Sequence, residues 1–107
     1  MYSTGCVMKL RPDGYDGYKK AHDELWPEIA ASMSDHDVSM AIYRCSDRLF
    51  LFACSPTEAD WDASREYEVL EKWKDYMREF LEDNDEGTDL YFEELPAAFH
   101  FGLFKED

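Results

Sequence analysis

Two strand-like segments that follow each other closely place the strongest limit on the fold of this chain. Residues 38–44 (VSMAIYR) and 48–55 (RLFLFACS) are rich in β-branched and aromatic residues, which favour extended backbone. Only the short polar run CSD separates them, and so short a connection joins antiparallel neighbours. The sequence therefore predicts a β-hairpin over residues 38–55.

A strand and an interrupted helix are predicted before this hairpin. Residues 6–10 (CVMKL) have an alternating, strand-like side-chain pattern and are followed by RPDG. Proline and glycine favour a turn there, and Asp13 can cap a helix. Apolar and aromatic residues then recur at steps of three and four, as on one helix face: Tyr15, Tyr18, His22, Leu25, Trp26 and Ile29. Pro27 has no amide hydrogen and crowds the preceding turn, so we expect a kink or break near Trp26.

A second helical region and a last strand are predicted after the hairpin. Ser55, Pro56 and Glu58 have the spacing of a helix cap, first helical position and capping box. The polar run DASRE offers a break between two helices, and an apolar stripe follows it at Tyr67, Leu70, Trp73, Met77, Phe80 and Leu81. We interpret residues 82–89 (EDNDEGTD) as a solvated acidic loop and 98–104 (AFHFGLF) as a mostly buried strand.

The order of these elements predicts an α+β fold. Strand, helix, strand, strand, helical region and strand make the ferredoxin-like βαββαβ arrangement, an antiparallel sheet with helices on one face. The other face needs a cover if it is apolar. Two copies packed sheet against sheet would provide it, which gives a homodimer of the dimeric α/β-barrel type. With 107 residues, we expect a single domain spanning 1–107.

Charge and cysteine content restrict the partners and the compartment. The net charge is −14, from 25 acidic and 11 basic residues. Such a surface repels phosphates and anionic lipids, so we expect neither nucleic acid nor membrane as a partner. No basic and apolar leader and no membrane-spanning stretch is present in the sequence. The three cysteines form no CxxC pair, and we expect a cytoplasmic protein.

Four residues stand out as candidates for chemistry. Tyr18 and His22 are four residues apart, so a phenol and an imidazole share one helix face. The pair either fills the margin of the core or faces a site. Trp73 belongs to the apolar stripe and has the pattern of a core residue. Lys74 falls on the edge of that stripe, where it either reaches out to water or lines a wet cleft.

Other residues carry weaker signals. His36 in SDHD is expected in solvent, and His100 between two phenylalanines is expected on the last strand. The three histidines have no metal-ligand spacing, and no nucleotide or nucleophile motif is present, so no metal and no cofactor is expected. Cys6, Cys45 and Cys54 are interpreted as small core residues in or beside strands.

The sequence resembles the L-rhamnose mutarotases. The resemblance rests on YKKAHDELWPEI (18–29), preceded by VMKLRPDGYDGY and followed by AIYR (41–44) and EKWKDYM (71–77). It implies a cofactor-free isomerase that interconverts the α and β anomers of a monosaccharide, L-rhamnose or a related deoxy sugar. It also implies that His22 is the proton donor and that Tyr18 contacts the sugar.

The resemblance also implies substrate contacts at Met40, Trp73 and Lys74. The family often has tyrosine at the first of these positions and two tryptophans at the others, so Met40 and Lys74 depart from the pattern and the preferred sugar is open. Two alternatives remain. One is a non-catalytic sugar-binding or regulatory module on the same fold, and the other is a cofactor-free oxygenase of similar dimeric ferredoxin-like architecture.

Overall fold

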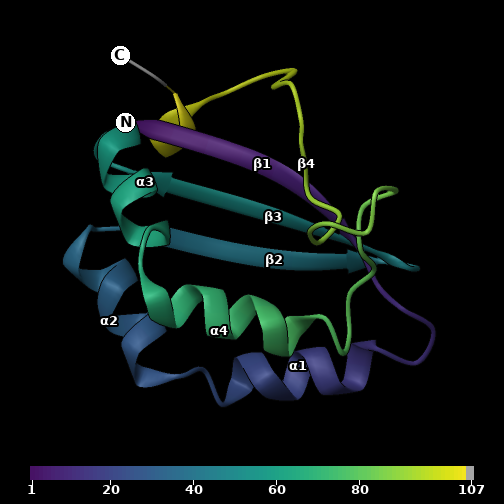
Figure 1. Cartoon of the computed structure of the whole chain (residues 1–107). Helices are drawn as coiled ribbons and strands as arrows, with labels where there is room; N and C mark the ends of the chain where they lie inside the picture. Colours follow the sequence, from purple (N-terminus) through teal and green to yellow (C-terminus); the bar gives the residue numbers. More distant parts are fainter. Residues whose placement is uncertain (106–107) are drawn as a thin grey trace.

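The computed structural model describes residues 1–105 as one sheet with four α-helices (Figure 1). The elements in chain order are β1 (Tyr2–Lys9), α1 (Tyr15–Asp23), α2 (Pro27–Asp35), β2 (Ser39–Cys45), β3 (Arg48–Ser55), α3 (Glu58–Arg65), α4 (Glu68–Met77), β4 (Glu93–Glu94) and the 3-10 turn η1 (Gly102–Phe104).

The sheet has the strand order β2-β3-β1-β4, and its three neighbouring pairs are all antiparallel. The β2–β3 hairpin is confirmed, with Ser39 opposite Cys54 and Cys45 opposite Arg48. The antiparallel α+β ferredoxin-like fold is confirmed as well. In this arrangement β1 lies in the middle of the sheet, between β3 and β4.

The helices gather on one side of the sheet, and the core lies between the two layers (Figure 1). Every second side chain of a strand points towards the helices and contributes to the core. Leu49 and Leu51 of β3 do so and are almost fully buried. Leu70 and Met77 of α4 are buried against them. The apolar stripe predicted on the second helical region is therefore a core stripe.

Helix α1 lies very close to the segment that follows α4. A Cβ atom added at Gly14 would stand 2.4 Å from the carbonyl oxygen of Phe80, and one added at Gly17 would stand 2.3 Å from the Phe80 ring. At Gly14 the close neighbour is backbone, so only glycine fits there, whereas a side chain at Gly17 would displace the Phe80 ring. This close approach fixes the position of α1, which carries Tyr18 and His22.

The predicted break at Pro27 is confirmed. Helix α1 ends at Asp23, and α2 begins with Pro27 at its first position, where proline's missing amide hydrogen costs nothing. Trp26 between them has an extended backbone (φ −59°, ψ 133°). The break predicted at DASRE is also confirmed, since α3 ends at Arg65 and α4 begins at Glu68.

Both predicted helix caps are wrong. Gly14, not Asp13, precedes α1, and Asp13 has a left-handed backbone with φ of 61°. Helix α3 is capped by Thr57, whose hydroxyl accepts a hydrogen bond from the Asp60 amide at 3.1 Å. Ser55 is the last residue of β3 and donates to the Thr57 carbonyl instead. Ser55 and Thr57 both have hydroxyl groups that can cap a helix, so the sequence did not determine where α3 begins.

The predicted last strand is also wrong. The fourth strand is Glu93–Glu94, paired with Cys6 and Val7 of β1, and residues 98–104 contain only the η1 turn. Phe99 and Phe101 are 81% and 80% exposed. The segment has the composition of a buried strand, but nothing in the described part of this chain covers it. His100 consequently does not lie on a strand.

Two smaller points complete the fold. Cys6 and Cys54 are buried as expected, but Cys45 is exposed at the end of β2, so the prediction that it is a core residue is wrong. No helix within residues 1–105 has the length and apolar character needed to cross a membrane.

Candidate active site

A cavity of about 610 Å³ lies between the helices and the sheet. Its walls come from all four α-helices, from β1, β2 and β3, and from Asp89, Leu90 and Phe92 near the acidic loop. All five residues singled out from the sequence line this one cavity: Tyr18, His22, Met40, Trp73 and Lys74. Positions from three separate parts of the chain therefore meet at the same place.

His22 is held by its own helix. Its Nδ1 lies 2.9 Å from the carbonyl oxygen of Tyr18, one turn earlier. A carbonyl only accepts, so Nδ1 carries the hydrogen and Nε2 has the free lone pair in the neutral ring. No side-chain nitrogen or oxygen that is fully buried within residues 1–105 lacks a partner. Nε2, which has none there, is therefore accessible, and His22 lines the cavity.

Burial lowers the pKa of His22 below its ordinary value of 6.5, and the bond to the Tyr18 carbonyl and the charge of Asp23 oppose this only in part. Removing a charged imidazolium from water is unfavourable, which is why burial favours the neutral ring. At neutral pH the cavity therefore presents an unprotonated Nε2, a group ready to accept a proton.

Tyr18 lies beside the imidazole and is only 5% exposed. The two ring centroids are 4.2 Å apart. Burial raises the pKa of the Tyr18 phenol, and the positive charge of Arg65 opposes that rise only weakly. The hydroxyl consequently stays protonated at neutral pH and can both donate and accept a hydrogen bond.

Aromatic rings form the wall next to His22. Trp73 is 7% exposed and meets the His22 ring edge to face at 5.2 Å. Trp26 packs on Trp73 at 5.0 Å and stacks on Tyr76 at 5.9 Å. Such contacts restrict the rotation of each ring. Trp26 therefore supports the wall from behind, while Trp73 faces the cavity.

Met40 and Lys74 have different relations to solvent. Met40, on β2, is partly buried and packs against the core cluster. The Lys74 side chain is 34% exposed, and its Nζ lies 3.7 Å from Glu71 on the same helix. Lys74 thus lies at the cavity edge with its ammonium group directed towards an exposed carboxylate. Lys74 therefore lines the cavity and also reaches out to solvent, so each of the two interpretations is correct in part.

Arg65, the last residue of α3, was not predicted as a site residue. It lines the cavity with Trp61, and its guanidinium carbon lies 5.1 Å from the centre of the Trp61 ring. Burial lowers its pKa, against the opposing influence of Tyr67, Cys6 and Tyr18. No carboxylate of residues 1–105 pairs with it. The spacing of four from Trp61 placed both on one face, but nothing in the sequence indicated a missing partner.

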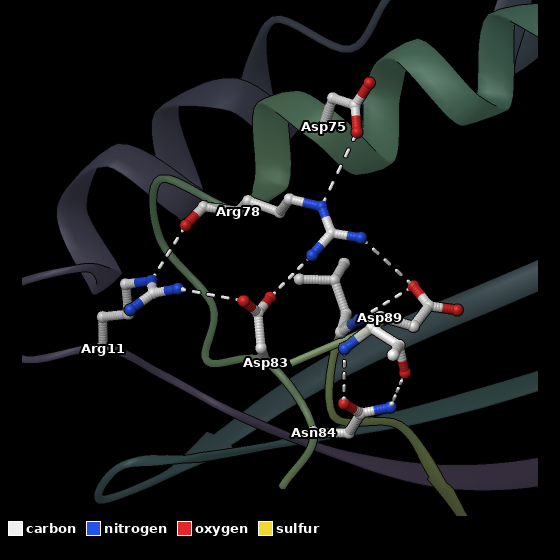
Figure 2. A network of polar contacts seen from close by, with 8 residues as sticks. Arg11, Asp75, Arg78, Asp83, Asn84 and Asp89 are labelled. Carbon is white, nitrogen blue, oxygen red and sulfur yellow. Dashed lines mark hydrogen bonds and ion pairs between the residues drawn. The ribbon is translucent and has the colours of Figure 1, made fainter. Parts of the chain in front are cut away.

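The segment at the cavity mouth is held by a polar network (Figure 2). Arg78 contacts three carboxylates: Asp83 at 2.7 Å, Asp75 at 3.6 Å and Asp89 at 3.6 Å. Arg11 also reaches Asp83, at 3.9 Å, and donates to the Arg78 carbonyl. The prediction of a solvated acidic loop holds for residues 85–89, which are exposed, and is wrong for Asp83, which is partly buried and anchors the loop.

Asn84 closes the loop on itself. Its side-chain oxygen accepts a hydrogen bond from the Thr88 amide at 3.1 Å (Figure 2). Its own backbone amide donates to the Asp89 carbonyl at 2.8 Å. Asp89 and its neighbour Leu90 line the cavity. The network therefore determines where this wall of the cavity stands.

The remaining histidines lie elsewhere. His36 is 3.9 Å from Asp60 and, like His100, does not line the cavity. Within residues 1–105, no three His, Cys, Asp or Glu side chains gather closely enough to hold a metal ion.

The sheet order, with a cavity between the sheet and its helices, defines a ferredoxin-like α+β protein. A family model described as L-rhamnose mutarotase matches residues 3–101. The chain belongs to the L-rhamnose mutarotase family. This confirms the resemblance on which Met40, Trp73 and Lys74 were selected.

Individual relatives agree with this assignment. The chain is 37% identical over 103 residues to an L-rhamnose mutarotase from Klebsiella pneumoniae, covering 94% of this chain and 98% of the relative. The crystal structure of an L-rhamnose mutarotase from Formosa agariphila is similar, with a TM-score of 0.77, 25% identity, and 95% and 100% of the two chains covered.

A second structural likeness concerns the fold alone. A putative antibiotic biosynthesis monooxygenase from Nitrosomonas europaea matches with a TM-score of 0.62 but only 16% identity, covering 92% of this chain and all of that one. The oxygenase alternative therefore gains support for its scaffold and none for its chemistry.

Proposed function

We propose that this protein is a mutarotase that interconverts the α and β anomers of L-rhamnose, with His22 as the group that moves the proton. Membership of the L-rhamnose mutarotase family supports the activity. The role of His22 rests on one observation: its Nδ1 is bound to the Tyr18 carbonyl, which leaves Nε2 as the free nitrogen in the cavity.

Anomer exchange needs a proton to leave one oxygen and another to reach its neighbour. The anomeric hydroxyl loses its proton, the bond from C1 to the ring oxygen breaks, and the ring oxygen gains a proton. The open chain then rotates about C1–C2 and closes on the other face of the carbonyl. Both oxygens are bonded to C1, so a single imidazole nitrogen can reach both.

The lowered pKa of His22 sets the order of these transfers. The neutral ring first accepts the proton of the anomeric hydroxyl at Nε2 and then, as imidazolium, donates it to the ring oxygen. Positioned acid–base catalysis of this kind contributes about 100- to 10,000-fold. No hydride or phosphate is transferred, and the proton count balances within the pair of sugar and imidazole.

The neighbouring groups would orient the sugar. The protonated Tyr18 hydroxyl is proposed to hydrogen-bond a sugar oxygen, because it lines the cavity beside His22. Trp73 offers a flat apolar surface to the C–H face of the pyranose, and Met40 adds an apolar contact.

Magnetisation-transfer NMR on the anomeric protons of L-rhamnose tests the proposal. Catalytic amounts of the protein should increase the exchange rate between the two anomers, and His22→Ala should return it to the uncatalysed rate. His36→Ala is the matched control, because it removes an imidazole outside the cavity. It should retain the wild-type rate.

Two results would contradict the proposal. If the wild-type protein accelerates no sugar, the activity itself is wrong, and a binding module becomes the better description. If His22→Ala, folded as judged by its circular dichroism, keeps the wild-type rate, another group moves the proton.

We also propose that Lys74 sets the choice of sugar. Its ammonium at the cavity edge replaces apolar stacking surface with a hydrogen-bond donor. Comparing exchange rates for L-rhamnose and its 6-hydroxylated counterpart L-mannose tests this. Lys74→Trp should shift the preference towards the deoxy sugar, and an unchanged ratio would exclude Lys74 from selection.

A homodimer is proposed through the sheet face opposite the helices. From β1 to β2, strand pairing places two rows of side chains there: Val7, Phe50 and Tyr43 in one row and Gly5, Phe52 and Ala41 in the other. Glu93 of the edge strand β4 continues the first row beyond Val7. Phe52 is 41% exposed and Tyr43 65%. None of the six is charged in a chain with 25 acidic residues. Such a face can meet its own copy without repulsion.

Light scattering on the purified protein tests the dimer. The wild type should have twice the chain mass, and Phe52→Glu should be monomeric because a twofold contact brings the two new carboxylates together. Ala30→Glu, the same charge change at an exposed position of α2, should remain dimeric. A monomeric wild type would refute the proposal.

A cytoplasmic location is also proposed, because Cys6, Cys45 and Cys54 are all free and free thiols persist in a reducing compartment. Fractionation of the source cells, with a periplasmic and a cytoplasmic marker, would test this.

A further inference from the structure

Arg65 is a cation at the cavity that has neither a carboxylate nor a hydrogen-bond acceptor among residues 1–105. Four other basic side chains line the cavity or hold its wall, and each has a partner. Lys19 pairs with Asp23, Lys74 with Glu71, Arg78 with three carboxylates, and Arg44 donates to the Ser46 carbonyl. Arg65 has only the face of the Trp61 ring.

An unpaired guanidinium is costly in such a place. Burial of a charge without a compensating partner opposes folding, and the pKa of Arg65 is lowered by burial. The net charge of −14 makes carboxylates abundant in this chain. Their absence around Arg65 within residues 1–105 therefore leaves its donors free for something other than the protein.

The direction of those donors follows from their accessibility. Every fully buried side-chain nitrogen or oxygen of the described residues has a partner. The unpaired guanidinium nitrogens of Arg65 are consequently those that reach open space, and Arg65 lines the cavity. Its charge is close enough to act on the Tyr18 phenol and the Cys6 thiol. Arg65 and Tyr18 line the same cavity.

We propose that Arg65 is a substrate-binding residue, whose guanidinium donates hydrogen bonds to hydroxyl oxygens of the sugar on the side of the ring held by Tyr18 and Trp61. This inference rests on the proposed function and adds a binding group to it. Guanidinium groups offer several donors in one plane, which suits two neighbouring hydroxyl oxygens of a pyranose.

Kinetics of Arg65→Ala test the proposal with the same NMR exchange measurement. Hydrogen bonds from a charged group correspond to about a 10- to 100-fold rise in KM, and kcat should change much less because Arg65 does not handle the proton. Lys72→Ala is the control: Lys72 is exposed on α4 and outside the cavity. It should keep both constants.

Chemical rescue separates binding from a structural role. Millimolar guanidinium chloride should lower the raised KM of Arg65→Ala, whereas ammonium chloride at the same concentration should not. A residue that only supports the fold would give no such selective rescue. An unchanged KM in Arg65→Ala, or a loss confined to kcat, would overturn the proposal, as would a raised KM that guanidinium does not lower.

The failure of the proposed function has a different signature. If the wild type accelerates no anomer exchange, saturation-transfer difference NMR still reports sugar binding. Binding that is present in the wild type and lost in Arg65→Ala would support the role of Arg65 without catalysis. Equal binding by both, or no binding by either, would overturn it.

Discussion

Two arginines near the cavity differ in how their charge is balanced. Arg78 contacts Asp75, Asp83 and Asp89, and through them it fixes the loop that forms one wall (Figure 2). Arg65 on another wall has no carboxylate partner among residues 1–105. One guanidinium is engaged in building the wall, while the donors of the other remain available. Arginine therefore stabilises the structure at position 78 and, as proposed, binds the ligand at position 65.

The largest expected effect is the pH dependence of catalysis, which neither arginine should control. Because the His22 pKa is lowered, kcat/KM should be level near neutral pH and fall in acid, about tenfold per pH unit, with a midpoint below 6.5. Below this midpoint Nε2 of the free enzyme is already protonated and cannot accept. NMR exchange rates measured from roughly pH 4.5 to roughly pH 8 would show the acidic limb.

Arg65→Met and Arg78→Met should both retain this acidic limb, since neither guanidinium is bonded to His22. A limb that disappears in either variant would connect that arginine to the proton transfer. A limb centred above pH 6.5 would show that burial does not control the His22 pKa.

The next effect is a loss of stability, and this loss should appear only for Arg78. Arg78→Met leaves three carboxylates without their common partner, and for a half-exposed network we expect a loss of about 1–2 kcal/mol in the free energy of unfolding. Urea unfolding measures it. The KM should rise too, because Asp89 and Leu90 line the cavity. Full stability in Arg78→Met would mean that the loop is held by other contacts.

Arg65→Met should affect stability in the opposite direction. Replacing an unpaired, largely buried cation with an apolar side chain of similar length should leave the free energy of unfolding equal or higher by about 1 kcal/mol. The same urea experiment checks this. A loss as large as that expected for Arg78→Met would show that Arg65 is a structural residue after all.

The smallest expected effect is that of salt. Raising the ionic strength screens the repulsion within a chain of net charge −14 and so raises the melting temperature, but it also screens the partly exposed ion pairs of Arg78. The wild type should therefore gain less than Arg78→Met, by an amount equivalent to a few tenths of a kcal/mol. Arg65→Met should respond to salt as the wild type does. Thermal unfolding by circular dichroism at low and high potassium chloride distinguishes the three proteins.

Local signals in the sequence predicted much of the fold. The hairpin could be recognised because its turn and both strands are contiguous, and the break at Pro27 because proline acts on its own turn. Residues 98–104 misled the prediction for the opposite reason. Phe99 and Phe101 have strand-like alternation, but burial depends on what lies opposite, and in the described chain they are exposed.

The cavity was predictable only in part. The four-residue spacing placed Tyr18 and His22 on one helix face, and family resemblance supplied Met40, Trp73 and Lys74. Arg65 was missed because its significance lies in the absence of a partner, which no spacing reveals. The anchoring of Asp83 by Arg11 and Arg78 was missed because Arg11 precedes Asp83 by most of the chain.

The hydrogen bond from His22 to the Tyr18 carbonyl fixes the reactive tautomer, and it exists only while the last turn of α1 is helical. Helix α1 ends at Asp23, one residue after His22, and the chain does not continue as helix until Pro27. Helix ends fray before the rest of a protein unfolds. On warming, the imidazole should lose its orientation while the sheet is still intact, so catalysis should have a lower upper temperature limit than the fold that supports it.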